Sequence, residues 1–225
     1  MLDVHPPHHR LEGFKDFLIH LLTITVGLLI AVGIEGCVER HQKHELAREA
    51  RETLHNEIER NAKKMADTLV DIDKDEANIK ENIAVVTRFA QHPKDKNQHG
   101  NIAVNYSFKE WDNTAWTTAQ TTGALAFMPY DEANQFSRIY DSQHSVSVSQ
   151  EKFAEDSVQF SGALYRSDMD NLTPEQAGLL MERLGIMQSH LVTLKVLAES
   201  SAAADKAFLT GKNDVSFHFH EDFSN

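Results

Sequence analysis

The sequence predicts an all-α protein in which an N-terminal transmembrane helix runs into an antiparallel bundle of about four long helices. Three observations predict this fold: an apolar run from Phe17 to Val38, apolar residues at steps of three and four after it, and only 10 glycines and 5 prolines among 225 residues. We expect a short N-terminal tail at 1–16, the membrane helix at 17–38, a bundle domain at 39–211 and a C-terminal tail at 212–225.

The apolar run is long enough to cross a bilayer. Its 22 residues would form a helix of roughly 33 Å, against a hydrocarbon core of about 30 Å. His20 is the only strongly polar residue between Phe17 and Ile34. A cleaved signal peptide is the alternative, but its apolar region is usually about 7 to 15 residues long and ends at a small-x-small site, which 32–35 lacks. We therefore expect a retained single-pass anchor, with the lipid bilayer as a partner.

Cys37 follows the apolar run and the small residue Gly36, as in a bacterial lipoprotein processing site. Glu35 does not fit that pattern, so the favoured interpretation is a lone thiol at the membrane boundary. A single cysteine also excludes an intrachain disulfide.

One face of the anchor carries small residues. Gly27 and Ala31 are four residues apart and share a face with Thr23 and Glu35, whose carboxylate can reach the interface. Small residues let two membrane helices approach closely. The Gly27/Ala31 face therefore indicates a homo-oligomer contact.

Two signals for the orientation of the anchor disagree. Arg10 and Lys15 precede the anchor, whereas four basic residues follow it closely: Arg40, Lys43, Arg48 and Arg51. That excess favours a cytoplasmic C-terminal domain. A short basic N-terminus before one span is, however, also how a signal anchor exports the domain behind it. We favour export.

The first bundle helix is predicted by a heptad-like seam behind the anchor. Charged residues, among them Glu57, Glu59 and Arg60, are placed beside the seam. No proline or glycine occurs between Val38 and His92, so we expect the membrane helix to continue into this one, up to a polar loop at 91–105. The seam residues are Ile58, Ala62, Met65, Leu69, Ile72, Ile79, Ile83, Val86 and Ala90.

A second helix is predicted to start at Ser107, with Glu110 completing a capping box. Its stripe is thin: Trp111, Ala115, Ala119 and Gly123. A third helix is predicted to start near Pro129, with Phe136, Tyr140, Gln143, Val146, Phe153, Phe160 and Leu164 along one face.

The fourth helix has the clearest start, with Thr173 as the cap, Pro174 in the first turn and Gln176 three residues after the cap. Its seam is Ala177, Leu180, Leu184, Met187, Leu191, Leu194 and Ala198. After Gly211 we expect fraying, with a short strand at 215–219 as the alternative.

The domain behind the anchor is acidic. Residues 39–225 hold 20 of the 22 basic and 30 of the 34 acidic residues, a formal balance of about −10. Nonspecific nucleic-acid binding requires clustered positive charge, so we expect no nucleic-acid partner.

Two sets of residues resemble an uncharacterised family of bacterial single-pass membrane proteins, a domain of unknown function. The first set lies in 17–60, where Ile-Glu-Gly-Cys-Val-Glu ends the anchor and Leu54, His55, Asn56 and Glu57 follow. The second set is Asn113-Thr114-Ala115-Trp116, Ala119-Gln120, Thr122-Gly123-Ala124-Leu125 and Tyr140. The resemblance covers most of the chain. It implies a bacterial source and a bacterial inner membrane, which adds weight to export of the C-terminal domain to the periplasm, and it implies no activity for any residue.

Candidate metal ligands occur at helical spacing. Glu52 with His55, and Asp141 with His144, have the Glu/Asp-x-x-His spacing of di-iron bundles. Two further inward carboxylates would be needed, so we expect no metal site. Other histidines occur at His5, His8, His9, His41, His44, His218 and His220, and we interpret them as solvated or interfacial.

Trp111 and Trp116 could form a ligand platform beside a groove of threonines at 114, 117, 118, 121 and 122, but aromatic anchoring in the core is the favoured interpretation. The sequence has no phosphate-binding glycine loop, nucleophile elbow or His-Glu-x-x-His motif. We therefore expect no catalytic residue and no cofactor. The predicted function is a non-enzymatic interaction or scaffolding module with an unknown protein partner. The alternative is a ligand-sensing extracytoplasmic bundle that acts through a partner.

Overall fold

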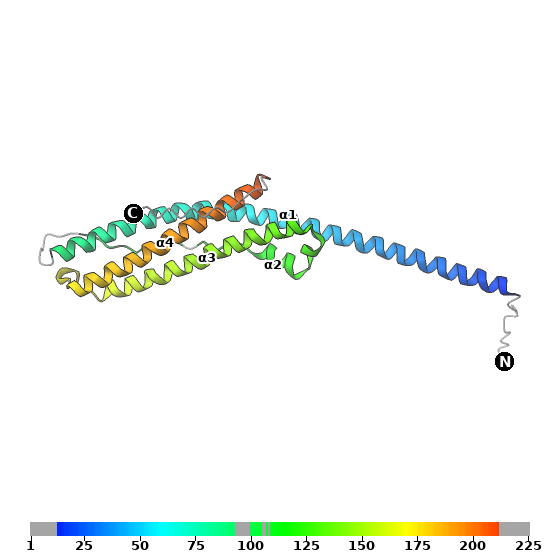
Figure 1. Ribbon diagram of the computed structural model, residues 1–225, viewed down its shortest axis with the longest axis horizontal. Coiled ribbons are helices and arrows are strands. Elements are labelled where there is room, and N and C mark those ends of the chain that lie inside the picture. Colours follow the sequence, from blue (N-terminus) through cyan, green and yellow to red (C-terminus); the bar gives the residue numbers. More distant parts are fainter. Residues whose placement is uncertain (1–12, 93–99, 105–106, 108, 212–225) are drawn as a thin grey trace, which may run out of the picture. The chain divides into compact units, whose positions relative to one another are not determined.

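The computed structural model describes residues 13–92, 100–104, 107 and 109–211, and these residues contain helices but no strand. The all-α prediction is confirmed (Figure 1). The elements are α1 (Phe14–Gln91), α2 (Thr114–Thr121), η1 (Ala124–Phe127), α3 (Tyr130–Tyr165), η2 (Met169–Asn171) and α4 (Pro174–Leu209), where η1 and η2 are 3₁₀ helices.

Helix α1 is unbroken from Phe14 to Gln91, as the absence of proline and glycine after Val38 predicts. The chain divides into two compact units, Met1–Glu49 and Ala50–Asn225. In the first unit, α1 contains the one stretch of the described chain that is long and apolar enough to cross a membrane. Two threonines in this stretch, Thr23 and Thr25, donate their hydroxyls to the carbonyls one turn back, which keeps these groups bonded inside a helix.

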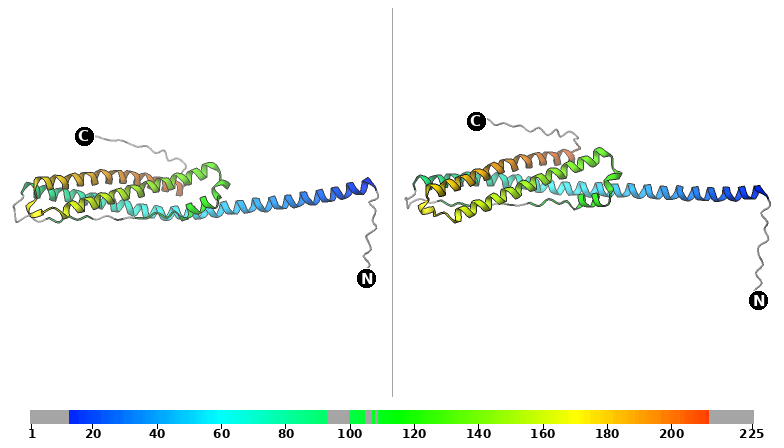
Figure 2. Two further views of the ribbon diagram at one scale, coloured as in Figure 1. Left: turned by 90° about the horizontal axis from the view of Figure 1, so that it is seen from below. Right: turned by 60° about the horizontal axis from the view of Figure 1, so that its bottom comes forward.

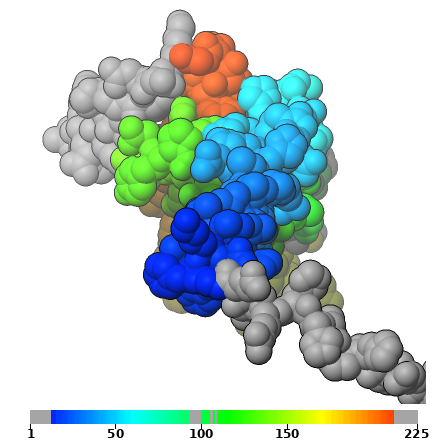
Figure 3. Space-filling model, turned by 90° about the vertical axis from the view of Figure 1, so that its right-hand side faces the viewer, coloured from blue at the N-terminus to red at the C-terminus, as the bar shows by residue number. Residues whose placement is uncertain are grey.

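In the second unit, α1 and α3 run parallel and α4 runs antiparallel to both (Figures 1 and 2). The parallel direction follows from three contacts in which the residue numbers on α1 and α3 rise together. These contacts are Arg51 with Glu132, Glu57 with Tyr140, and Asn61 with Gln143. At one end of the unit, the ring of Phe208 lies 5.3 Å from that of Phe136 and 5.7 Å from that of His55. Figure 3 views the start of α3 and the end of α4 from this end.

The prediction of four long antiparallel helices is wrong for the second helix. Helix α2 has eight residues and begins at Thr114, so Ser107 does not start a helix. The described residues between α1 and α2 form a return segment (100–104, 107 and 109–113) without helical structure, and it runs back along α1. This return is what allows α1 and α3 to be parallel.

Side chains of α1 hold the return segment by its backbone. Asn82 donates to the carbonyl of Ala103 at 2.8 Å and accepts from its N–H at 3.3 Å. A Cβ on Gly100 would lie 2.7 Å from Val85, so glycine permits the close approach there. Backbone groups bonded to side chains of α1 are unavailable for a helix, which is the physical reason why the segment is not helical.

The core lies on the predicted seams of α3 and α4. All seven predicted seam residues of α4 are buried, as are six of the seven on α3; Leu164 is half-buried. The cap of α4 is also confirmed: Thr173 accepts from the N–H of Gln176 at 3.2 Å, and Gln176 accepts in return at 3.1 Å.

The seam of α1 is confirmed at Ile58, Met65, Ile72, Ile79 and Val86, which are buried, but Ala90 is exposed. Glu57 differs from the prediction more strongly, because it is only 1% exposed rather than solvated beside the seam. Residues 215–219 lie outside the described residues, as does most of the predicted 91–105 loop.

Candidate functional site

Glu57 caps α2 from a different helix. Its carboxylate accepts from the backbone N–H of Ala115 at 2.9 Å and of Trp116 at 3.3 Å, in the first turn of α2. The N-cap residue of α2, Asn113, makes no side-chain hydrogen bond to the first turn. An acidic group is favourable at this position because the free N–H groups give a helix N-terminus partial positive charge. Glu57 therefore fixes where α2 begins.

Tyr140 of α3 completes this cap. Its hydroxyl donates to Glu57 at 2.8 Å, and its ring stacks on Trp116 with centroids 5.0 Å apart and planes at 13°. Burial raises the pKa of the Tyr140 hydroxyl, and the hydrogen bond to Glu57 raises it further. The hydroxyl therefore stays protonated and acts as a donor.

A chain of buried amides links the same region to α4. Asn61 donates to Gln143 at 2.8 Å, and Gln143 donates to Asp205 at 3.1 Å. Asn61 also pairs with the backbone of Asp112, donating to its carbonyl at 2.7 Å and accepting from its N–H at 2.9 Å. One polar chain thus connects α1, the return segment, α3 and α4.

Asp205 is the last residue of this polar chain, and its buried carboxylate is only partly hydrogen-bonded. It is fully buried, and one carboxylate oxygen, Oδ2, has no hydrogen-bond partner among the described residues. Burial raises the pKa of Asp205 to about 6, although the hydrogen bond from Gln143 opposes that shift. The hydroxyl of Ser201, one turn earlier on α4, is likewise buried without a partner in the described part.

The outer edge of the cluster is ionic. Lys64 donates to Asp112 and to the carbonyl of Glu110, each at 2.8 Å, and Arg60 donates to Asp112 at 3.3 Å. Lys64 first and then Arg60 hold the pKa of Asp112 below its usual range. These pairs close the return segment over the buried cluster.

The cluster unites two sets of residues singled out from the sequence. Glu57 comes from the first set and Ala115, Trp116 and Tyr140 from the second, although they are far apart in the chain. Their contacts position a helix and a return segment, and the acceptor oxygens of Glu57 are occupied by that task. The sequence pattern did not single out Asn61 or Asp205 as buried polar residues. The available sign of a buried polar chain was a polar residue, Gln143, within an apolar seam.

The Glu/Asp-x-x-His pairs do not form a metal site in the described part of the chain. Glu52, His55, Asp141 and His144 are all exposed, and the described residues contain no group of three His, Cys, Asp or Glu side chains that could hold a metal. The exposed pair at 41 and 44 also belongs to no such group. His5, His8, His9, His218 and His220 lie outside the described residues.

The tryptophans do not form the alternative ligand platform. Trp111 packs against the hydrophobic core, and Trp116 is half-buried against Tyr140. The threonines of α2 are exposed, and the hydroxyls of Thr121 and Thr122 donate to carbonyls within the helix. Aromatic anchoring is the arrangement observed.

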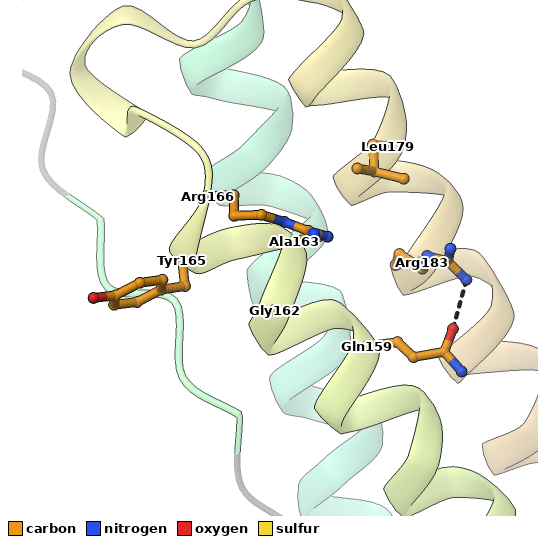
Figure 4. Close-up of a pocket in the computed structure, with 7 residues that line it drawn as sticks. All are labelled: Gln159, Gly162, Ala163, Tyr165, Arg166, Leu179 and Arg183. Atoms are coloured by element: carbon orange, nitrogen blue, oxygen red, sulfur yellow. Dashed lines mark hydrogen bonds between the residues drawn. The ribbon is translucent and has the colours of Figure 1, made fainter.

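Two surface depressions lie on the α3–α4 pair. In one, of about 350 Å³, Arg166 and Arg183 reach over the surface, and Arg183 donates to Gln159 at 2.7 Å (Figure 4). Its lining has no carboxylate, histidine, serine or cysteine. In the other, of about 380 Å³, His190 pairs through Nδ1 with Asp156 and joins α4 to α3. Neither depression brings together a nucleophile and a base by a hydrogen bond among the described residues.

Comparison of the chain with protein-family models, curated proteins and solved structures gives no match.

Proposed function

We propose that the chain is a single-pass protein of the bacterial inner membrane whose helical unit is a non-enzymatic interaction or scaffolding module. One observation carries the membrane part of this proposal. Every residue from Phe17 to Val38 is exposed, including Ile24 at 70% and Leu29 at 66%. Soluble monomers rarely expose contiguous apolar patches larger than a few hundred Å², so a surface of this kind requires a lipid or protein environment.

The scaffolding part is supported by how the polar side chains of the second unit are used. The carboxylate of Glu57 and the amides of Asn61 and Gln143 bind backbone or one another across elements. Such bonds position secondary structure, whereas catalysis requires polar groups that face a substrate cavity. The unit accordingly presents partners with a rigid helical surface.

Disrupting the apolar stretch should release the protein from membranes. We expect the wild-type chain to stay in the membrane pellet after alkaline carbonate extraction, with an intact N-terminus by mass spectrometry. The double variant Leu28→Arg/Leu29→Arg should lose stable insertion, because each arginine at the centre of a membrane helix costs about 2.5–3.5 kcal/mol. Val70→Arg, which changes an exposed residue of the second unit, is the control and should stay in the pellet.

Release of the wild-type chain by carbonate, or loss of its first residues through cleavage, would contradict the anchor.

The same membranes test the proposed periplasmic side of the second unit. In a Cys37→Ser background, a cysteine at exposed Ser145 should react with a membrane-impermeant maleimide added to spheroplasts, whereas protection until lysis would place it in the cytoplasm.

We also propose that the Gly27/Ala31 face mediates self-association. In the Cys37→Ser background, Gly27→Cys or Ala31→Cys should give disulfide-linked dimers on mild oxidation in membranes. Leu29→Cys lies on the opposite side of the helix and should give several-fold fewer, since 3.6 residues make one turn. Equal crosslinking at all three positions, or none at any, would exclude this face.

A further inference from the structure

A small cavity, partly open to solvent, lies between α1, α3, α4 and the return segment, away from the cluster around Glu57. Its volume of about 10 Å³ is close to the space that one water molecule or one ion occupies. Three apolar side chains close part of it. The remaining lining residues all carry side-chain oxygen atoms: Thr68, Asp71, Asp75, Ser107 and Gln150.

Gln150 is the first sign that this cavity is built for a ligand. Its side chain lines the cavity from α3 and is only 4% exposed, yet it makes no hydrogen bond with any other described residue. Its amide atoms are not among the fully enclosed side-chain atoms of the described residues, so they stay open to the space of the cavity. A cation bound in that space would take the lone pairs of the Gln150 carbonyl oxygen.

The second sign is a pair of carboxylates on one face of α1. Asp71 and Asp75 are four residues apart, so their side chains are neighbours on the helix surface. Asp71 accepts from Lys74 at 2.8 Å, and Ser107 and Lys109 lie near it. Asp75 makes no hydrogen bond with another described residue. Burial, and then repulsion by Asp71, raise the pKa of Asp75 to about 6.

We propose that this cavity binds one divalent hard cation, Ca²⁺ in particular, through oxygen atoms of Asp71, Asp75 and Gln150. Carboxylate and amide oxygens are the ligands that Ca²⁺ takes, and it tolerates irregular coordination, whereas Mg²⁺ requires a near-ideal octahedron. The lining residues include no histidine or cysteine, which disfavours Zn²⁺ and Cu²⁺. The hydroxyls of Thr68 and Ser107 lie on the same cavity and complete an all-oxygen surface.

Bound Ca²⁺ would join α1 to α3 through the oxygens of Asp75 and Gln150, which make no hydrogen bond with another described residue, and through Asp71, which also pairs with Lys74. Two charges on the ion balance the two carboxylates, so the repulsion between Asp71 and Asp75 becomes attraction to a shared ion. A ligand that binds only the folded state raises its stability by mass action. Saturating Ca²⁺ should therefore raise the melting temperature of the full chain.

The test uses the full-length protein in detergent, stripped with EDTA and then given CaCl₂ at constant ionic strength. We expect the melting temperature to rise by about 5 °C at 100-fold excess over Kd, and calorimetric titration to give one site per chain. Asp75→Asn should melt higher than wild type without Ca²⁺, since it removes the repulsion, and should lose the response to Ca²⁺. Gln150→Leu should stay folded and bind Ca²⁺ at least tenfold more weakly. Asp67→Asn, an exposed aspartate on α1 outside the cavity lining, is the control and should respond as wild type.

The proposal fails if the wild-type chain shows neither a CaCl₂-dependent shift nor binding heat. It also fails if Asp75→Asn and Gln150→Leu both respond to Ca²⁺ as strongly as Asp67→Asn does. Higher melting of Asp75→Asn combined with an unresponsive wild-type chain would show a strained carboxylate pair and no ion site.

Discussion

Replacing Glu57 with alanine should lower the free energy of unfolding of the second unit by roughly 4 kcal/mol, since buried donors left without an acceptor cost about 1–3 kcal/mol each. The change strands three donors: the N–H groups of Ala115 and Trp116 and the hydroxyl of Tyr140. The melting temperature, measured by circular dichroism, should then fall by about 10 °C. No other single substitution in the cluster removes as many acceptor contacts.

Two variants sharpen this test. Glu57→Gln keeps one oxygen acceptor and should be intermediate. Glu59→Ala removes an exposed carboxylate on the same helix, whose ion pair is with Lys63 at 2.9 Å, and should leave stability nearly unchanged. A loss below about 1 kcal/mol for Glu57→Ala would show that the cap on α2 does not contribute materially to stability.

Replacing Asp205 with asparagine should stabilise the protein at neutral and alkaline pH and not in acid. The folded pKa of Asp205 is raised to about 6, whereas an unfolded aspartate titrates near about 3.9. The folded state therefore binds the proton more tightly, and the ionised carboxylate destabilises the fold. The cost is fully present above pH 6, falls as the pH drops through 6 toward 4, and disappears below that.

The difference in pKa corresponds to roughly 3 kcal/mol, so we expect a gain of roughly 2 kcal/mol for Asp205→Asn at pH 8. The amide can keep the acceptor for Gln143, and it removes the buried charge from the unpartnered Oδ2 position. Chemical denaturation at pH 8 and at pH 4 measures the effect. Glu199→Gln, an exposed change on the same helix, should show no such pH dependence. An equal effect of Asp205→Asn at both pH values would contradict the assignment.

The start of α4 is predictable from sequence because its determinants are local. Thr173, Pro174 and Gln176 lie within four positions, and their hydrogen bonds depend only on the turn that they form. The buried seams are predictable for a similar reason, since the helical period places apolar residues on one face whatever the partner is.

The start of α2 is not predictable in this way. Ser107 and Glu110 satisfy the local rule for a capping box, but the acceptor that caps α2 is Glu57, 58 positions before Ala115. Side chains of α1 also bind the backbone of 109–113, which stays non-helical although the local pattern of Ser107 and Glu110 favours a helix. The same distant partners bury Glu57 and Asn61. The heptad pattern alone predicts Glu57 to be solvated beside the seam, and it gives no reason to single out Asn61.

The cavity lined by Gln150 is even less predictable from the sequence. A glutamine four residues after Val146 fits a helical seam, and aspartates at 71 and 75 fit a solvated face of α1. What distinguishes them is that α1, α3 and the return segment bring their oxygens to one small cavity, which is a property of the packing and not of any one helix.

The parallel arrangement of α1 and α3 also has a consequence for synthesis. The partners Arg51–Glu132, Glu57–Tyr140 and Asn61–Gln143 are separated by 81, 83 and 82 residues, so the offset is nearly constant. At about 5–20 residues per second, the ribosome makes the second member of each pair roughly 4 to 16 seconds after the first. During that interval Arg51, Glu57 and Asn61 lack their partners on α3, although Glu57 and Asn61 can already bind the backbone at 112–116. The polar groups of α1 that pair with α3 therefore stay solvated, or bound to another molecule, until α3 is made.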